Sequence, residues 1–285
     1  MQNSIAILRQ SLTSLYDSRE VKSIISLLLE EVCGVSRIDA IMNPDMVLPK
    51  EKAEILKSFA ARLSTGEPVQ QVLGYEYFIG RKFEVNKDVL IPRPETAELV
   101  AWIVDKNKKE NPVILDIGTG SGCIAISLAA LINKSTVFAA DLSTGALKTA
   151  KRNADNLKIS NVEFVEMDIL EKQNESFEHP NVDNFDIIVS NPPYITNQEK
   201  KEMTTNVLDF EPRLALFVPD EDPLLFYRAI AKFGLKNLCE GGMLFFEINA
   251  AYGHETCELL ETFGYKNVTL RKDINDRERM IFATK

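Results

Sequence analysis

The chain has 285 residues, long for one domain and sufficient for two, and its 45% hydrophobic content is ordinary for a globular protein. Its formal net charge of −9 argues against a broad basic surface that follows a nucleic-acid backbone, so we expect no stable nucleic-acid binding. Polar residues throughout positions 1–15 predict neither a signal peptide nor a membrane span. The four cysteines are scattered and are expected to be buried free thiols: Cys33, Cys123, Cys239 and Cys257. Free thiols favour a cytoplasmic protein. We also expect the protein to be a monomer.

The first third of the chain is predicted to be helical. Apolar residues recur at helical spacing over residues 21–32, and Gly34 stands where a helix would end. A second helix is predicted over residues 49–63. Such apolar stripes are typical of an ordinary core, and the functional alternative is that this small bundle grips a macromolecular partner. We place a helical domain at residues 1–73.

Aromatic and β-branched residues alternate over residues 74–91, which predicts a β-hairpin. Residues 74–93 would then link the helical domain to a second domain at residues 94–285. That domain alternates strands with helices, which predicts a doubly wound α/β sheet. Strands are expected at 112–118, 136–140, 162–167, 185–190 and 243–248, helices at 96–105, 123–132, 223–239 and 254–263, and a closing antiparallel pair at 268–270 and 279–283.

The loop Gly118-Thr119-Gly120-Ser121-Gly122 lies between a predicted strand and a predicted helix. Glycines at such a turn let the backbone approach a ligand, because no Cβ stands in the way. The spacing differs from the G-x-G-x-x-G/A pattern of dinucleotide-binding folds, since Cys123 occupies the sixth position, so an NAD-dependent oxidoreductase is disfavoured.

Two further strands end in acidic residues. Asp141 follows the second strand, where an acid reaches the hydroxyls of an adenosine ribose, although a solvated turn or a helix N-cap is the alternative. Asp168 and Ile169 follow the third strand, where they could flank an adenine.

The fourth strand ends in Asn191, Pro192, Pro193 and Tyr194. The Asn191 side chain and the Pro192 carbonyl, whose direction the proline rings restrict, would offer two acceptors side by side. Two such acceptors suit a planar –NH₂ group, on which Tyr194 would stack. The alternative is that the two prolines only terminate the strand.

These motifs together resemble the class I S-adenosylmethionine-dependent methyltransferases. The NPPY sequence is similar to that of the members that methylate adenine N6, guanine N2 or the glutamine side-chain amide. Four more stretches, spread over nearly the whole chain, resemble the release-factor glutamine methyltransferases: residues 66–68 (GEP), 89–96 (VLIPRPET), 211–216 (EPRLAL) and 273–279. The chain departs from that family's pattern at Ala97, Asn249 and residues 217–225.

The resemblance implies methyl transfer from S-adenosylmethionine to N5 of the glutamine in the Gly-Gly-Gln motif of class I peptide-chain release factors, without a metal ion or a general base. It implies that the helical domain holds the release factor. Asn191, Pro192 and Tyr194 would be catalytic and, with Pro193, would bind the substrate. The cofactor would contact Gly118, Thr119, Gly120, Ser121, Gly122, Asp141, Asp168, Ile169 and Asn191.

Two other functions stay open from the residues themselves. One is an N-methyltransferase that acts on a flipped adenine or guanine in nucleic acid. The other is a module that binds the cofactor without catalysis. Arg93, Glu95 and Glu247 could each contact a ligand or form a structural ion pair.

Overall fold

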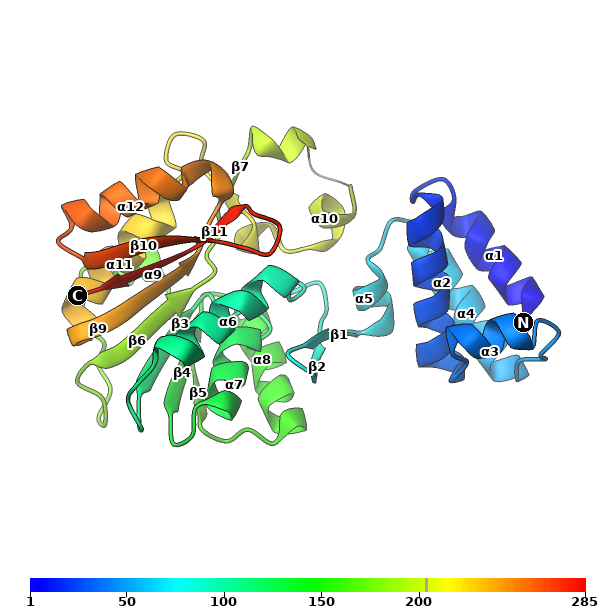
Figure 1. The fold of residues 1–285 in the computed structure, drawn as a ribbon, viewed down its shortest axis with the longest axis horizontal. Helices are drawn as coiled ribbons and strands as arrows, with labels where there is room; N and C mark the ends of the chain where they lie inside the picture. Colours follow the sequence, from blue (N-terminus) through cyan, green and yellow to red (C-terminus); the bar gives the residue numbers. More distant parts are fainter. Residues whose placement is uncertain (203–204) are drawn as a thin grey trace. The chain divides into compact units, whose positions relative to one another are not determined.

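The computed structural model of the chain describes residues 1–202 and 205–285 (Figure 1). Its residues divide into two compact units. The helical unit comprises Met1–Gly74 and helix α10 (Thr205–Phe210), and the sheet unit comprises residues 75–202 and Glu211–Lys285.

The helical unit is built on amphipathic helices around an apolar core. Its N-terminal helices are α1 (Gln2–Leu12), α2 (Ser18–Cys33), α3 (Arg37–Met42), α4 (Lys50–Leu63) and α5 (Val69–Leu73). The Asp17 carboxylate caps α2 by accepting from the backbone N–H groups of Arg19 and Glu20, and Gly34 ends the helix with φ of 68°. The predicted helices that correspond to α2 and α4 are confirmed, and α1, α3 and α5 were not predicted.

The sheet unit begins with the hairpin of β1 and β2 and continues as alternating strands and helices. Its strands are β1 (Tyr75–Phe78), β2 (Arg81–Glu84), β3 (Val113–Ile117), β4 (Thr136–Asp141), β5 (Val162–Glu166), β6 (Phe185–Ser190), β7 (Ile195–Thr196), β8 (Phe217–Val218), β9 (Leu238–Glu247), β10 (Lys266–Lys272) and β11 (Glu278–Thr284). Its α-helices are α6 (Pro94–Lys106), α7 (Cys123–Leu131), α8 (Thr144–Leu157), α9 (Ile169–Lys172), α11 (Leu225–Asn237) and α12 (Gly253–Thr262). Short 3₁₀ helices lie at Glu199–Glu202, Arg213–Ala215 and Ala250–Tyr252.

The main sheet has seven strands in the order β10-β11-β9-β6-β3-β4-β5. Strands β9, β6, β3, β4 and β5 are parallel, and β11 runs antiparallel to both β9 and β10. The chain moves from β3 towards β5 in one direction and then returns to place β6 on the other side of β3. This order confirms the predicted doubly wound mixed sheet, and it makes the β3–β6 boundary the topological switch point.

Each face of the sheet has its own apolar core, because successive strand residues point to opposite faces. Helices α6, α7 and α8 cover one face, and α9, α11 and α12 cover the other (Figure 1). The first core includes Trp102, Ile114 and Ile187, and the second includes Leu115, Ile188 and Phe233.

Two sequence-based expectations need correction. The cysteines are free, but only Cys123 is buried, whereas Cys33, Cys239 and Cys257 are half-buried, because they lie at element ends or on partly exposed helix faces. The strand predicted at residues 243–248 is β9, which begins five residues earlier at Leu238, because Leu238 already pairs with Phe185 of β6 before a register irregularity that precedes Met243. Within the described residues, the helices are all too short or too polar to cross a membrane.

Candidate active site

The register of the parallel strands brings the sequence-predicted residues to one edge of the sheet. Ile117 at the end of β3 pairs with Ala140 of β4 and with Ser190 of β6. Ser190 in turn pairs with Phe246 of β9. The glycine loop, Asp141, Asn191 and Glu247 therefore all leave the sheet at the carboxyl ends of neighbouring strands, around the switch point where open α/β sheets bind ligands.

The glycine loop has room on its outer side. The N–H groups of Gly118 and Thr119 both donate to the carbonyl of Ala140, at 2.8 and 3.0 Å, which fixes the start of the loop. Gly118 and Gly120 have φ of 74° and 56°, and a Cβ built on either would meet no atom within 4 Å. The loop therefore offers open backbone at these two positions, as a closely approaching ligand requires.

Asp141 is held by the loop that it faces. Its Oδ2 accepts from the N–H of Gly120 at 2.9 Å, and its Oδ1 accepts from the N–H of Ser143 at 2.8 Å. Burial raises the pKa of Asp141, and these backbone donors partly oppose the rise. Helix α8 is capped by Ser143, not by Asp141. Each carboxylate oxygen keeps a further lone pair with which to accept a ligand hydroxyl.

Asp116 is a further candidate site residue, which was not predicted. It lies inside β3, fully buried, where its Oδ2 accepts from the Thr119 hydroxyl at 2.7 Å and from the N–H of Ala125 at 3.2 Å. Its Oδ1 is buried without a hydrogen-bond partner in the described part of the chain. Burial raises the pKa of Asp116 to about 7. An aspartate inside an otherwise apolar strand was the available signal, because a buried acid needs a partner.

Asp168 and Ile169 follow β5 at the same edge. The Asp168 side chain caps α9 by accepting from the N–H of Leu170 at 2.8 Å, and Ile169 is buried. Ser121, in the glycine loop, is also buried, and its hydroxyl has no partner among the described residues.

The Asn-Pro-Pro-Tyr segment follows directly after β6. The Ser190 hydroxyl donates to the carbonyl of Ile117 at 2.6 Å, so the ends of β6 and β3 are tied together where the two motifs begin. The Asn191 amide nitrogen donates to the Thr96 hydroxyl oxygen at 3.4 Å. In the described part of the chain, nothing donates to the Asn191 Oδ1 or to the carbonyl of the buried Pro192. Both oxygens keep lone pairs that can accept hydrogen bonds.

Glu247 is the centre of a polar cluster beside Asn191. Its carboxylate is 1% exposed, and it accepts from the Thr96 hydroxyl at 2.6 Å and from the Tyr194 hydroxyl at 3.4 Å. Burial raises the pKa of Glu247, which the Thr96 hydrogen bond and the charge of Arg279 oppose. The Tyr194 ring packs partly buried against the α11 face of the sheet.

Two of the residues whose roles were open are now placed. Arg93 forms an ion pair with Glu211 at 2.5 Å, and the Glu211 carboxylate also accepts from the N–H of Ile91. This is the structural ion pair that was one of the two expectations for Arg93. Glu247 belongs to the polar cluster instead, since hydroxyl groups occupy its carboxylate.

Asn249, which departs from the family pattern, supports the same region. Its amide nitrogen donates to the carbonyl of Tyr194 at 3.0 Å and to the Glu199 carboxylate at 2.9 Å. Its Oδ1 accepts from the N–H of Ala251 at 2.9 Å. The Asn249 side chain therefore supplies one hydrogen bond to the backbone of the Asn-Pro-Pro-Tyr segment, at Tyr194.

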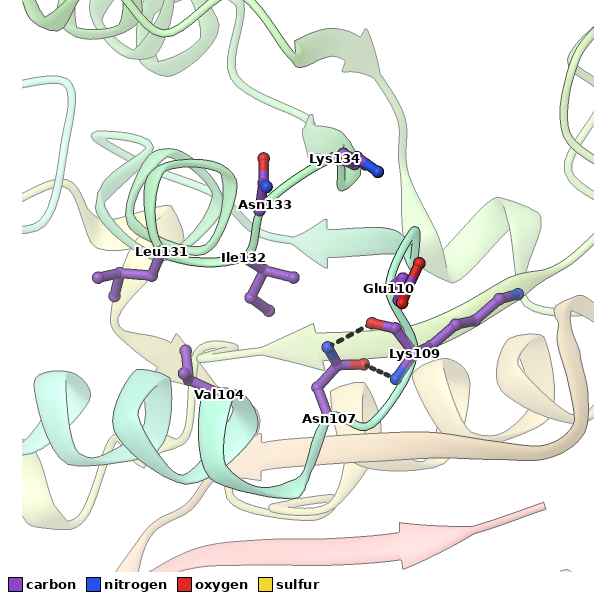
Figure 2. Close-up of a pocket in the computed structure, with 8 residues that line it drawn as sticks. All are labelled: Val104, Asn107, Lys109, Glu110, Leu131, Ile132, Asn133 and Lys134. Carbon is purple, nitrogen blue, oxygen red and sulfur yellow. Dashed lines mark hydrogen bonds between the residues drawn. The ribbon is translucent and has the colours of Figure 1, made fainter.

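A surface depression lies at the opposite edge of the sheet, at the amino end of β3, between the ends of α6 and α7 (Figure 2). Two of its polar residues already have partners. Asn107 exchanges two hydrogen bonds with the backbone of Lys109 (Figure 2). Lys109 also forms an ion pair with Asp186 at 2.8 Å. The depression is separate from the glycine loop and from Asn191, and we assign it no part in the site.

The chain is similar to known proteins over nearly its whole length. A family described as "PrmC N-terminal domain" matches residues 6–74, and one described as "Methyltransferase domain" matches residues 108–243. A release factor glutamine methyltransferase of Flavobacterium psychrophilum is 47% identical over 276 residues, which are 95% of this chain and 94% of that protein. One of Bacteroides thetaiotaomicron is 46% identical over 100% of both chains. A methyltransferase structure from Pyrococcus furiosus, 17% identical, covers 79% of this chain and 96% of that one with a TM-score of 0.51, which supports the fold.

Proposed function

This chain belongs to the family of release factor glutamine methyltransferases, and we propose that it transfers a methyl group from S-adenosylmethionine to N5 of the glutamine in the Gly-Gly-Gln motif of class I peptide-chain release factors. The observation that carries the proposal is that Asn191 Oδ1 and the Pro192 carbonyl have no donor in the described part of the chain, at the end of β6, which pairs with the strand that carries the glycine loop. A primary amide has two N–H groups to donate to such a pair.

The residues at the switch point fit the cofactor. Gly118 and Gly120 leave room for close backbone approach, Asp141 has acceptor capacity for ribose hydroxyls, and the unpartnered Oδ1 of Asp116 suits an ammonium or hydroxyl donor. Asp168 and Ile169 would lie towards the adenine. When bound, S-adenosylmethionine supplies a methyl group already activated on a sulfonium.

Asn191 and Pro192 act on the substrate nitrogen. An amide nitrogen is a weak nucleophile, because its lone pair is delocalised into the carbonyl group. By accepting both N–H hydrogens, Asn191 Oδ1 and the Pro192 carbonyl would fix the position of the nitrogen and its orientation relative to the methyl group of the cofactor. Fixing the reacting group in a partly desolvated site supplies a large share of the rate enhancement in many enzymes. The nitrogen releases its extra proton after transfer, so no general base is required.

The helical unit would hold the release factor. Four large hydrophobic side chains of α3 and the loop that follows are exposed: Ile38 (72%), Ile41 (68%), Met42 (73%) and Val47 (88%). Several exposed apolar side chains on one short segment are typical of a surface that binds another protein. We propose that residues 1–73 position the factor.

Mass spectrometry tests the proposal directly. A class I release factor incubated with the enzyme and S-adenosylmethionine should gain one methyl group, located on the glutamine of its Gly-Gly-Gln peptide. A factor with glutamate at that position is the matched control and should gain none. Parallel reactions with DNA and RNA test the competing nucleic-acid function. Methylated adenine or guanine together with an unmodified factor would overturn the proposal, and no transfer to any acceptor would favour a non-catalytic module.

A further inference from the structure

We propose that Thr96 is a positioning residue that, together with Glu247, sets which way round the Asn191 side-chain amide faces the substrate. The inference rests on the proposed function, because it concerns the group that would accept the substrate's N–H. Thr96 belongs to the PRPET segment at the start of α6 and lies 95 residues before Asn191 in the chain.

The orientation follows from the hydrogen atoms that each group has. An ionised carboxylate only accepts hydrogen bonds, so the 2.6 Å contact between Thr96 Oγ1 and Glu247 Oε2 must use the single hydroxyl hydrogen of Thr96. The Thr96 oxygen then has only lone pairs to offer to its other neighbour. Asn191 must therefore present its NH₂ group to Thr96, at 3.4 Å, and the planar amide leaves Oδ1 on the other side.

This order requires an ionised Glu247: the hydrogen bonds from Thr96 and Tyr194 favour that form, whereas burial, the largest influence, raises the pKa of the carboxyl. The hydroxyl of Tyr194 donates to its second oxygen, and the positive charge of Arg279 lowers its pKa, while burial and the charge of Glu95 raise it. Because the Thr96 hydroxyl donates its hydrogen to Glu247, a reversed Asn191 amide would place its Oδ1 next to Thr96 Oγ1, and neither oxygen would have a hydrogen to donate to the other. The reversed amide would also turn a donor towards the substrate's N–H groups, so the wrong orientation is unfavourable in two places.

Thr96→Val removes the hydroxyl and keeps the shape of the side chain. We expect kcat for release-factor methylation to fall about tenfold or more, within the range for a displaced catalytic group, with cofactor affinity by calorimetry unchanged. Thr96→Ser restores the hydroxyl and should return kcat to within about threefold of the wild type. Thr256→Val is the matched control: Thr256 is also buried in a helix, its hydroxyl donates to the Tyr252 carbonyl, and its replacement should leave kcat unchanged.

A double-mutant cycle separates positioning from a general structural effect. In an Asn191→Ala background no amide is left to orient, so adding Thr96→Val should reduce the residual kcat no further. If the valine variant does not fold, Glu247→Gln tests the same point, because the glutamine amide can donate to Thr96 and remove the constraint on Asn191. Glu247→Gln should lower kcat in the wild-type background and should not lower it further in the Asn191→Ala background. Undiminished kcat in Thr96→Val, or losses that add to that of Asn191→Ala, would overturn the positioning role alone. Failure of the wild-type enzyme to methylate the factor would instead overturn the proposed function.

Discussion

Two alanine substitutions in the glycine loop should have different consequences, although they lie only two residues apart. Gly120 and Gly122 have φ of 56° and 80°, a region in which an L-residue costs about 1–2 kcal/mol. At Gly122 the new Cβ would also lie 2.8 Å from Ile126 Cδ1 and 3.0 Å from the Ala150 Cβ. Overpacking of this kind adds about 1–3 kcal/mol.

Gly122→Ala should therefore destabilise the sheet unit by about 2–5 kcal/mol. At Gly120 the Cβ would meet no atom within 4 Å. Gly120→Ala should therefore lower the stability by only about 1–2 kcal/mol. Its methyl group would instead occupy the open side of the loop, where we place the cofactor, so this variant should lose cofactor affinity.

The chain's one tryptophan makes the measurement specific. Trp102 is buried in the sheet unit, with its ring 5.7 Å from that of Phe245, so its fluorescence during denaturant unfolding reports on that unit. Calorimetry with S-adenosylmethionine gives the affinity. The reasoning fails if Gly122→Ala is as stable as the wild type, or if Gly120→Ala binds the cofactor as tightly as the wild type does.

Four further predictions can be checked with the same tools. Asn191→Ala should lower kcat about 10²-fold or more, the scale for one lost group that stabilises the transition state, with only a modest change in cofactor affinity; near wild-type turnover would remove Asn191 from its role. Asp141→Ala should weaken cofactor binding, and unchanged affinity by calorimetry would contradict its placement beside the ribose. Burial raises the pKa of Asp116 from 3.8 to about 7, so the folded chain holds this proton more tightly than the unfolded chain does. The resulting stabilisation is full below pH 3.8 and is lost as the pH rises through about 7. In the wild type, the free energy of unfolding should fall by up to about 4 kcal/mol over this pH range because of Asp116, and Asp116→Asn should remove this fall. Equal pH slopes of stability in both proteins would refute the raised pKa of Asp116. Deletion of residues 1–73 should abolish methylation of the intact release factor while cofactor binding persists, and full activity of the truncated enzyme would contradict the role of the helical unit.

Local pattern was sufficient for most elements of the sheet unit. Strand β6 was predicted with its exact bounds and β3 to within a residue at each end, because a short apolar run closed by prolines or glycines has few other ways to fold. Helix α1 was not predicted, because polar residues interrupt its apolar positions and its packing against α4 supplies the stability. The meeting of the strand-end motifs at one edge was also predictable, since the carboxyl ends of parallel strands share one edge, and their role in binding stays a prediction.

The sequence by itself determined the kind of sheet, the edge of the sheet at which the motif residues gather and the Asn-Pro-Pro-Tyr segment that follows β6. Only the tertiary structure decided that Arg93 pairs with Glu211, that Asp116 keeps an unpartnered oxygen, and that Thr96 lies between Asn191 and Glu247. The physical reason is range. Propensity and periodicity act between residues a few positions apart, whereas Thr96 and Glu247 are 151 residues apart and meet only because strand order and register place β9 beside β6 under the start of α6.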